Sequence, residues 1–319
     1  MTTPTLLDQH PDLAQFRADV LRGLRRRHKR LPCKYFYDAA GSQLFDEICR
    51  LPEYYPTRTE LGILQSAAQA IAARIRPRAA VIEYGSGSSV KTRLLLRALH
   101  QPAAYVPVDI SREHLLASAA QLAAEFPHIP IHPVCADFTQ RISLPEELPA
   151  DARRVVYFPG STIGNFGPRS AQRLLRGMAR IVGKGGAAVI GTDLKKDPRI
   201  LERAYDDVAG VTAAFNRNLL VRINRELDGT FDPDNFRHHA LYNPRAGRIE
   251  MHLVSRRRHS IEIGGERIHF DDGEGIHTEN SYKFSIEEFQ DRAARAGLHG
   301  RAVWTDPHRW FCVHYLVAQ

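Results

Sequence analysis

Cysteine is scarce in this 319-residue chain, and its spacing argues against both a disulfide framework and a structural zinc site. The four cysteines, Cys33, Cys49, Cys135 and Cys312, are scattered, and no two of them form a CxxC pair. Small disulfide-stapled domains and zinc sites need closer, patterned spacing. The chain has 15 histidines, but none lies in an HExxH pattern. The sequence therefore predicts reduced thiols and no bound metal.

Long apolar runs are also missing. No stretch approaches the length that a membrane-spanning helix needs. Residues 1–10 are polar and include Asp8, where a secretory signal would need an apolar stretch. We therefore expect a cytoplasmic protein without membrane association. With 43% hydrophobic residues, the chain can form one large domain or two modest ones, each with its own core.

Basic residues outnumber acidic ones, and the formal net charge is +8. The densest basic runs, residues 25–30 and 256–258, have no aromatic residues interleaved. Such runs can bind nucleic acid, or they can be a solvated helix end and a strand edge. We favour the second interpretation, because the rest of the chain predicts a small-molecule pocket. We expect a monomer that binds a small molecule and no nucleic acid.

Strand and helix patterns alternate from residue 60 onward. Short apolar strands are predicted at residues 79–83, 105–109, 129–134, 154–158 and 187–191. This alternation predicts a parallel α/β sheet, and the nearly all-apolar strands fit burial on both faces. Two further strands, residues 302–305 and 311–317, close the chain as a terminal hairpin.

The pattern changes near residue 196, where residues 248–255 begin to alternate and Gly264-Gly265 signals a tight hairpin. Between the prolines and glycines of residues 35–56, a tyrosine-rich segment predicts a loop, either a docking arm or a pocket lid. We therefore predict two domains. Residues 61–195 and 284–319 form the cofactor-binding domain, and residues 1–60 and 196–283 form a smaller α+β substrate-binding domain.

A glycine-rich loop at residues 83–89 lies between a predicted strand and a predicted helix. Its glycines let the backbone pass close to a ligand, and the helix start offers free N–H groups. Asp109 ends the next strand, where a carboxylate can bind two ribose hydroxyls. Asp137 ends the strand after that, and the ring of Phe138 can lie against a base. Ligands of open α/β sheets bind at these carboxyl ends.

Three interpretations of this loop stay open. A nicotinamide dinucleotide prefers a full GxGxxG motif, and the third glycine is missing here. S-adenosyl-L-methionine has no phosphate and needs ribose, adenine and amino-acid contacts, which suit the acids and the Asp-Phe pair better. The third interpretation is a tight turn without a ligand. We favour S-adenosyl-L-methionine as co-substrate.

The chain resembles the histidine-specific methyltransferases of ergothioneine biosynthesis, a branch of the class I, Rossmann-like methyltransferases. The resemblance runs from about Leu31 to the end of the sequence and rests on blocks that follow one another in order. These blocks are residues 35–38, 51–58, 83–93, 160–165, 191–194, 203–207, 215–218, 223–227, 248–251 and 278–281. It implies a mainly parallel α/β sheet with a C-terminal antiparallel hairpin, plus a smaller α+β substrate-binding domain.

The resemblance also implies roles for single residues. The matched donor-binding positions are Gly85, Lys91, Asp109, Asp137 and Phe138. The positions that hold the carboxylate and amino end of the amino acid are Tyr55, Asn165 and Tyr205. The imidazole is read by Glu279 and Ser281, which flank Asn280, and further pocket-lining positions are Tyr37, Phe45, Thr212 and Met251. No general base is implied; Tyr37, Asn165 and Tyr205 are expected to orient the amine.

Two departures from the family pattern concern neighbours of these positions. Tyr84 replaces the usual leucine before Gly85, and Asn280 occupies a position that is more often apolar. Independently of the resemblance, Glu279 and Ser281 are two residues apart, so an extended segment points both to one side. A carboxylate can accept an imidazole N–H, and a hydroxyl can serve the other ring nitrogen. A surface acid and serine on a loop remain the alternative.

The resemblance implies methyl transfer to the α-amino nitrogen of L-histidine, three times in succession, giving Nα-trimethylhistidine (hercynine). A methyltransferase of the same fold that acts on another amino acid or amine stays open. A nucleic-acid methyltransferase is favoured only by the basic charge, and the Asn-Pro-Pro-aromatic motif of base methylation is missing. A binding module without turnover is the remaining alternative.

Overall fold

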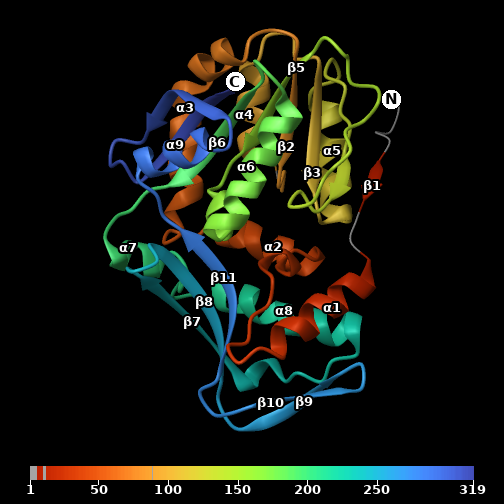
Figure 1. Cartoon of the computed structure of the whole chain (residues 1–319), viewed down its shortest axis with the longest axis vertical. Helices are drawn as coiled ribbons and strands as arrows, with labels where there is room; N and C mark the ends of the chain where they lie inside the picture. Colours follow the sequence, from red (N-terminus) through yellow and green to blue (C-terminus); the bar gives the residue numbers. More distant parts are fainter. Residues whose placement is uncertain (1–5, 10–11, 88) are drawn as a thin grey trace. The chain divides into compact units, whose positions relative to one another are not determined.

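The computed structural model describes residues 6–9, 12–87 and 89–319 (Figure 1). The chain divides into two compact units. The first unit comprises Met1–His10, Pro56–Lys195 and Tyr282–Gln319, and the second comprises Pro11–Tyr55 and Lys196–Ser281. Among the described residues, no helix is long and apolar enough to cross a membrane.

A single sheet organises the described part of the first unit. Its eight strands follow the order β1-β4-β3-β2-β5-β6-β13-β12. They are β1 (Leu7–Gln9), β2 (Ala79–Tyr84), β3 (Ala104–Asp109), β4 (Val134–Ala136), β5 (Arg153–Phe158), β6 (Ala187–Asp193), β12 (Leu298–Thr305) and β13 (Phe311–Ala318). Strands β1 to β6 pair in parallel, whereas β13 is antiparallel to both β6 and β12. The predicted parallel sheet with a C-terminal antiparallel hairpin is confirmed.

Helices cover both faces of this sheet. Neighbouring residues of a strand point to opposite sides, so each central strand packs against helices on both faces. Val81 and Tyr157 pack with α3 (Tyr55–Ile75), α4 (Val90–Ala98) and α5 (Arg112–Glu125). Ile82 and Phe158, one residue further along, pack with α6 (Pro168–Val182) and α9 (Ile286–Ala294). The 3-10 segment η2 (Thr162–Asn165) follows β5. The three layers explain why the central strands lack a polar face.

The second unit combines helices with two small antiparallel sheets. Its helical segments are α1 (Leu13–Leu24), η1 (Cys33–Phe36), α2 (Ala39–Ile48), α7 (Pro198–Arg203), α8 (Val211–Leu227) and η3 (Pro233–Asn235). Its strands are β7 (Phe236–Asn243), β8 (Arg248–Ser255), β9 (His259–Ile263), β10 (Glu266–Phe270) and β11 (Gly275–Tyr282). Strand β8 lies between β11 and β7, and β9 pairs with β10. The hairpin predicted at Gly264-Gly265 is confirmed, and both glycines have positive φ.

The predicted loop over the tyrosine-rich segment is wrong for residues 39–48, which form helix α2. Asp38 caps this helix by accepting a hydrogen bond from the Gly41 N–H at 2.8 Å. The same carboxylate accepts from Asn218 Nδ2 at 2.8 Å and from an Arg225 nitrogen at 2.6 Å. Glycine is required at position 41, because a Cβ there would lie 1.8 Å from the Phe36 carbonyl oxygen. Contacts with α8, which is distant in sequence, thus stabilise a helix that the composition of this segment does not predict.

Smaller differences concern the sheet edge. The strand predicted at residues 129–134 is shifted to β4, and Ile131 contributes only an isolated bridge to Tyr105. Strand β1 was not predicted, and it pairs in parallel with β4. The first unit therefore includes residues near the N terminus that the predicted boundaries place in the substrate-binding domain. That the second unit binds the substrate stays a prediction.

Candidate functional site

The glycine loop of the first unit turns sharply between β2 and α4. Gly85, Gly87 and Ser89 all have positive φ, at 69°, 46° and 58°. Ser88 of this motif lies outside the described residues. The Gly85 N–H donates to the Val108 carbonyl at 2.8 Å, so the turn is tied to the end of β3. Residues with a side chain rarely adopt this φ, so position 85 favours glycine. Because glycine has no Cβ, a ligand can approach the backbone closely there.

Asp109 ends β3 beside this loop. Its Oδ2 accepts from the Gly87 N–H at 3.1 Å, and its Oδ1 accepts from the Ser111 N–H at 3.0 Å. Burial raises the pKa of Asp109, while the hydrogen bonds from Ser111 and Gly87 oppose the rise. The two N–H groups fix the orientation of a half-buried carboxylate, which has further lone pairs for hydroxyl donors. Such a group fits the ribose of S-adenosyl-L-methionine.

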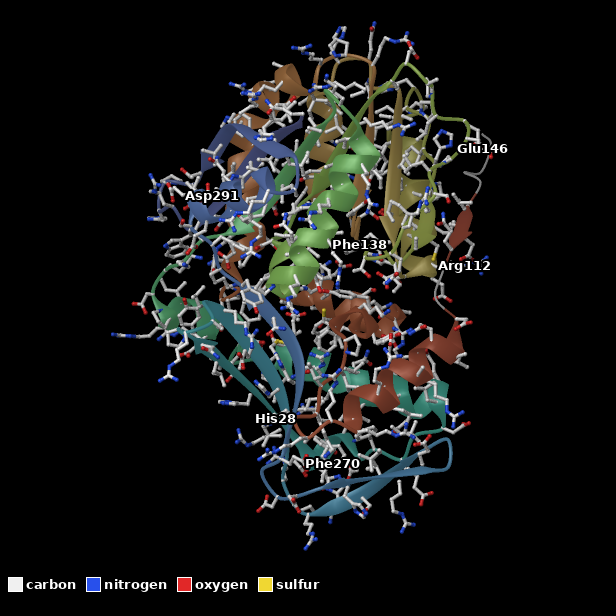
Figure 2. All side chains as sticks on the ribbon, in the orientation of Figure 1. His28, Arg112, Phe138, Glu146, Phe270 and Asp291 are labelled. Carbon is white, nitrogen blue, oxygen red and sulfur yellow. The ribbon has the colours of Figure 1, made fainter. Side chains whose placement is uncertain are left out.

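Asp137 and Phe138 follow β4 at the same edge of the sheet. Asp137 Oδ1 accepts from the Thr139 N–H at 2.9 Å and from its hydroxyl at 2.5 Å. The Phe138 ring, labelled in Figure 2, stacks on Tyr84 with centroids 5.3 Å apart. A Cβ on Gly85 would meet this ring at 3.8 Å. The glycine loop and a half-buried aromatic ring are therefore neighbours, as an adenine site requires.

Lys91 has a partner that sequence analysis missed. Its Nζ lies 2.6 Å from Glu60 Oε2, and the Glu60 side chain is fully buried. The same oxygen accepts from the Gly160 N–H at 2.9 Å. A Cβ on Gly191 would lie 2.2 Å from Glu60 Oε1, so glycine at that position makes room for the acid. Glu60 therefore sets the position of the Lys91 ammonium group; an isolated glutamate inside an amphipathic helix carries no sequence signal of this.

The acid before the glycine loop is also buried. Glu83 Oε2 accepts hydrogen bonds from the Thr92 and Tyr105 hydroxyls, both at 2.5 Å. Burial raises the pKa of Glu83 to about 8, against the effect of those two hydrogen bonds. Its side chain thus joins β2, β3 and α4.

In the second unit, five of the residues predicted to contact the substrate lie in one group with Tyr54, which was not predicted. The Tyr205 hydroxyl lies 2.7 Å from Ser281 Oγ, and the Tyr54 ring packs edge-on against Tyr205 at 6.0 Å. Phe45 contacts Tyr54 at 6.2 Å and Tyr37 at 5.7 Å.

Glu279 belongs to the same group. Burial raises the pKa of Tyr54 well above its usual value, and the nearby Tyr205, Cys49, Tyr37 and Glu279 raise it further. Glu279 lies on β11 and only 9% of the residue is exposed, so the alternative of a surface acid on a loop does not hold for this position. Tyr54 directly precedes Tyr55 in the block of residues 51–58, which is the one signal that could have found it.

The remaining predicted residues have separate surroundings. In the second unit, the Tyr55 hydroxyl accepts from Lys196 Nζ at 2.8 Å. The Met251 carbonyl accepts from Thr278 Oγ1 at 3.1 Å. The Thr212 N–H donates to Asp207 at 2.8 Å.

Two predicted residues are half-buried. Asn280 lies on β11, and Asn165 ends η2 in the first unit. The roles of all these side chains toward a substrate stay predictions.

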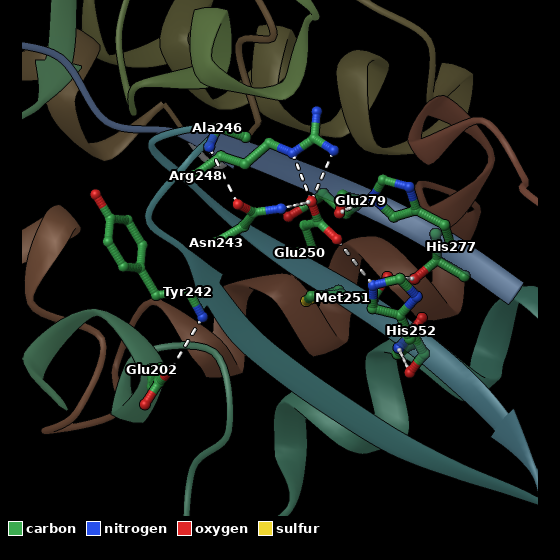
Figure 3. Close-up of polar contacts among 12 residues, drawn as sticks. Glu202, Tyr242, Asn243, Ala246, Arg248, Glu250, Met251, His252, His277 and Glu279 are labelled. Atoms are coloured by element: carbon green, nitrogen blue, oxygen red, sulfur yellow. Dashed lines mark hydrogen bonds and ion pairs between the residues drawn. The ribbon is translucent and has the colours of Figure 1, made fainter. Parts of the chain in front are cut away.

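One group of possible metal ligands occurs among the described residues. Glu250, His252 and His277 each have a ligand atom within 4.8 Å of the others (Figure 3). Those atoms are engaged, because Glu250 Oε1 accepts from Arg248 Nε at 2.8 Å and His277 Nε2 lies 2.9 Å from the Glu279 carbonyl oxygen. The two imidazole rings stack at 4.8 Å, so they do not converge on one point. We interpret the group as a hydrogen-bonded network and assign no metal to it.

Comparison with known proteins decides the family. A family model described as histidine-specific methyltransferase, SAM-dependent, matches residues 16–318. The chain belongs to this family. Its match over nearly the whole sequence includes both units, and it makes S-adenosyl-L-methionine the methyl donor of the family to which this methyltransferase belongs.

Curated relatives agree with the family assignment. The methyltransferase is 43% identical over 295 residues to histidine N-alpha-methyltransferase of Mycobacterium tuberculosis, with 91% of each chain covered. It is 44% identical over 296 residues to the protein of that name from Mycolicibacterium smegmatis, again with 91% of each chain covered. It is 30% identical to ergothioneine biosynthesis protein 1 of Neurospora crassa, covering 87% of this chain and 32% of that protein.

Replacement of Asp109 by alanine should weaken donor binding selectively. A hydrogen bond to a charged group is worth about 1.5–3 kcal/mol, so the Kd for S-adenosyl-L-methionine should rise about ten- to a hundred-fold. Calorimetry with each ligand alone should find the L-histidine affinity little changed. Glu113→Ala, which removes an exposed acid from the neighbouring helix α5, is the matched control. Equal losses for both ligands would contradict a ribose role.

Proposed function

We propose that this methyltransferase transfers methyl groups from S-adenosyl-L-methionine to the α-amino nitrogen of L-histidine, three times, as a step of ergothioneine biosynthesis. The observation that carries the proposal is the buried carboxylate of Glu279, two residues from Ser281, in a chain that a histidine-specific family model matches from residue 16 to 318. Glu279 lies on β11, and a carboxylate there can accept a hydrogen bond from an imidazole N–H. A cytoplasmic monomer without a metal remains our prediction.

The proposed substrate contacts involve both ring nitrogens of the imidazole. Glu279 accepts the N–H of one ring nitrogen. The Ser281 hydroxyl, which is hydrogen-bonded to Tyr205, donates to or accepts from the other nitrogen according to the tautomer. Tyr55, Asn165 and Tyr205 hold the carboxylate and amino group, and Phe45, Met251 and Thr212 line the pocket.

The proposed donor contacts come from the carboxyl ends of β2, β3 and β4. Asp109 binds the ribose hydroxyls, Asp137 and Phe138 bind the adenine, and Gly85 and Lys91 bind the amino-acid end. When bound, S-adenosyl-L-methionine supplies an activated methyl group on a positively charged sulfur, so the chain needs no nucleophile of its own.

Positioning and exclusion of water provide the catalysis that remains. The amine must be neutral, with its lone pair in line with the methyl carbon, and Tyr37, Asn165 and Tyr205 orient it. In each transfer the carbon–sulfur bond breaks as the carbon–nitrogen bond forms, and the N–H proton then leaves to solvent before the next transfer. After the third transfer the nitrogen carries no proton and no lone pair, so the reaction stops at the trimethylammonium.

Mass spectrometry of L-histidine incubated with the enzyme and the methyl donor tests this proposal. We expect successive gains of one, two and three methyl groups, with the trimethylated product accumulating. A panel of other amino acids and amines, run beside histidine, tests the substrate. Preferred methylation of another member of the panel would contradict histidine as the substrate, and binding without any mass gain would contradict the activity.

A further inference from the structure

We propose that His238 is a positioning residue. Its imidazole, held in one neutral tautomer by Asn216, binds the main-chain carbonyl of Tyr205 and thereby holds the Tyr205 hydroxyl in place for the substrate. This inference rests on the proposed function, in which Tyr205 contacts the amino acid. Neither His238 nor Asn216 was predicted as a site residue, although Asn216 lies in one of the blocks that carry the family resemblance.

Three linked hydrogen bonds determine which atom donates and which accepts in each pair. The carbonyl oxygen of His252 can only accept, so the Asn216 side-chain atom 3.1 Å from it is the amide nitrogen. The second N–H of this nitrogen points to His238 Nδ1 at 2.9 Å, so Nδ1 accepts. Nε2 then carries the ring proton and donates it to the Tyr205 carbonyl oxygen at 2.8 Å. The groups at both ends are carbonyls, which can only accept. This arrangement therefore pairs each donor with an acceptor.

Burial keeps this arrangement neutral. Asn216 is fully buried and the His238 side chain is 2% exposed. Burial lowers the pKa of His238, opposed by its hydrogen bond to Tyr205 and by the nearby Asp206 and Asp207. A proton on Nδ1 would place an N–H group against the N–H of Asn216. The hydrogen bonds therefore select the Nε2–H tautomer, and burial favours its neutral form.

The position of Tyr205 explains why its carbonyl needs a partner. Tyr205 lies two residues beyond the end of α7 at Arg203 and is buried, so its carbonyl needs a partner outside the helix. Strand β7 provides two attachments: the Tyr242 N–H donates to Glu202 Oε1 at 3.0 Å (Figure 3), and His238 donates to Tyr205.

The two ends of Tyr205 are thereby held independently. His238 binds the main chain at one end, and Ser281 Oγ lies 2.7 Å from the hydroxyl at the other. Loss of the first contact frees the backbone of Tyr205 while the Ser281 side chain, the Glu279 carboxylate and the donor loop stay unchanged. The expected defect is therefore specific to the amino-acid substrate.

Substitutions at His238 and at its neighbour His239 test the role. His238→Leu should raise the KM for L-histidine about tenfold, the effect of losing one buried hydrogen bond, with the KM for S-adenosyl-L-methionine changed less than about twofold. His238→Gln should recover most of the loss, because its amide N–H can reach the same carbonyl. His239→Leu, on the opposite side of β7, should resemble the parent enzyme.

Imidazole nitrogen NMR tests the tautomer without any turnover. The His238 signals are assigned by their loss in His238→Gln, and we expect an Nε2–H tautomer at neutral pH. Asn216→Leu removes one of the two contacts that select the tautomer, so it should weaken the preference for Nε2–H and raise the KM for L-histidine. An Nδ1–H tautomer or an imidazolium in the parent enzyme would overturn the inference, as would an unchanged KM for L-histidine in His238→Leu or a failure of glutamine to recover activity. Absence of histidine methylation by the parent enzyme would instead contradict the proposed function and leave the tautomer result standing.

Discussion

Replacement of Glu279 by alanine is expected to raise the KM for L-histidine about ten- to a hundred-fold, because a hydrogen bond to a charged group contributes about 1.5–3 kcal/mol. Glu279 is a buried residue of β11, 9% exposed, and its backbone carbonyl lies 2.9 Å from His277 Nε2, so the strand around it is well held. The substitution should therefore remove the imidazole contact without moving the strand. Steady-state kinetics with each substrate varied in turn measure the effect.

Two further substitutions show whether the charge of Glu279 or only its position matters. Glu279→Gln keeps an acceptor oxygen and should give a smaller loss than alanine. Glu262→Ala removes an exposed acid from β9, where it pairs with Arg267, and should leave the kinetics unchanged. Unchanged histidine kinetics in Glu279→Ala would rule out the role assigned to this residue.

Replacement of Asp193 by leucine should lower the free energy of unfolding by about 3–5 kcal/mol, since it removes the carboxylate that pairs with a buried ammonium group. Asp193 Oδ2 lies 2.7 Å from Lys283 Nζ, and the two side chains are 1% and 0% exposed. The pair joins the end of β6 to the segment before α9. Thermal denaturation should show a decrease of roughly 10 °C in the Tm.

The double variant Asp193→Leu/Lys283→Met is the matched control. Removal of both charges of a buried pair is often close to neutral, so the double variant should recover most of the lost stability. Asp151→Ala, which breaks the exposed pair with Arg78, should change the free energy of unfolding by less than about 1 kcal/mol. A double variant as unstable as the single one would show that the side chains act through packing and not through charge.

Local sequence patterns predicted those elements whose signals lie within a few residues. The Gly264-Gly265 turn and the terminal hairpin both follow from neighbouring residues, and both are present. Helix α2 was missed because its stability depends on Asn218 and Arg225, which lie on α8 far along the chain. Strand β1 has only three residues and no alternation that distinguishes it from a loop.

The candidate site shows the same division. Gly85 and Asp109 could be predicted from their places at strand ends, and Glu279 and Ser281 from their spacing and the family resemblance. Glu60 and His238 could not, and Tyr54 only from its place beside Tyr55, because each acts through a contact that only the folded chain creates. Lys91 forms an ion pair with Glu60, the Tyr205 ring packs against Tyr54, and the Tyr205 carbonyl accepts a hydrogen bond from His238. In every case the two residues are far apart in the sequence.

Strand β13 has a consequence for how the chain is made. It lies between β6 and β12, so β6 has no neighbour on that side until Phe311–Ala318 is present. Residues 196–281, which belong to the second unit, are synthesised in the interval. A nascent chain that stalls on the ribosome before residue 311 therefore exposes the N–H and C=O groups of a strand that is fully buried in the finished protein. Such an edge is a template for pairing with other polypeptides.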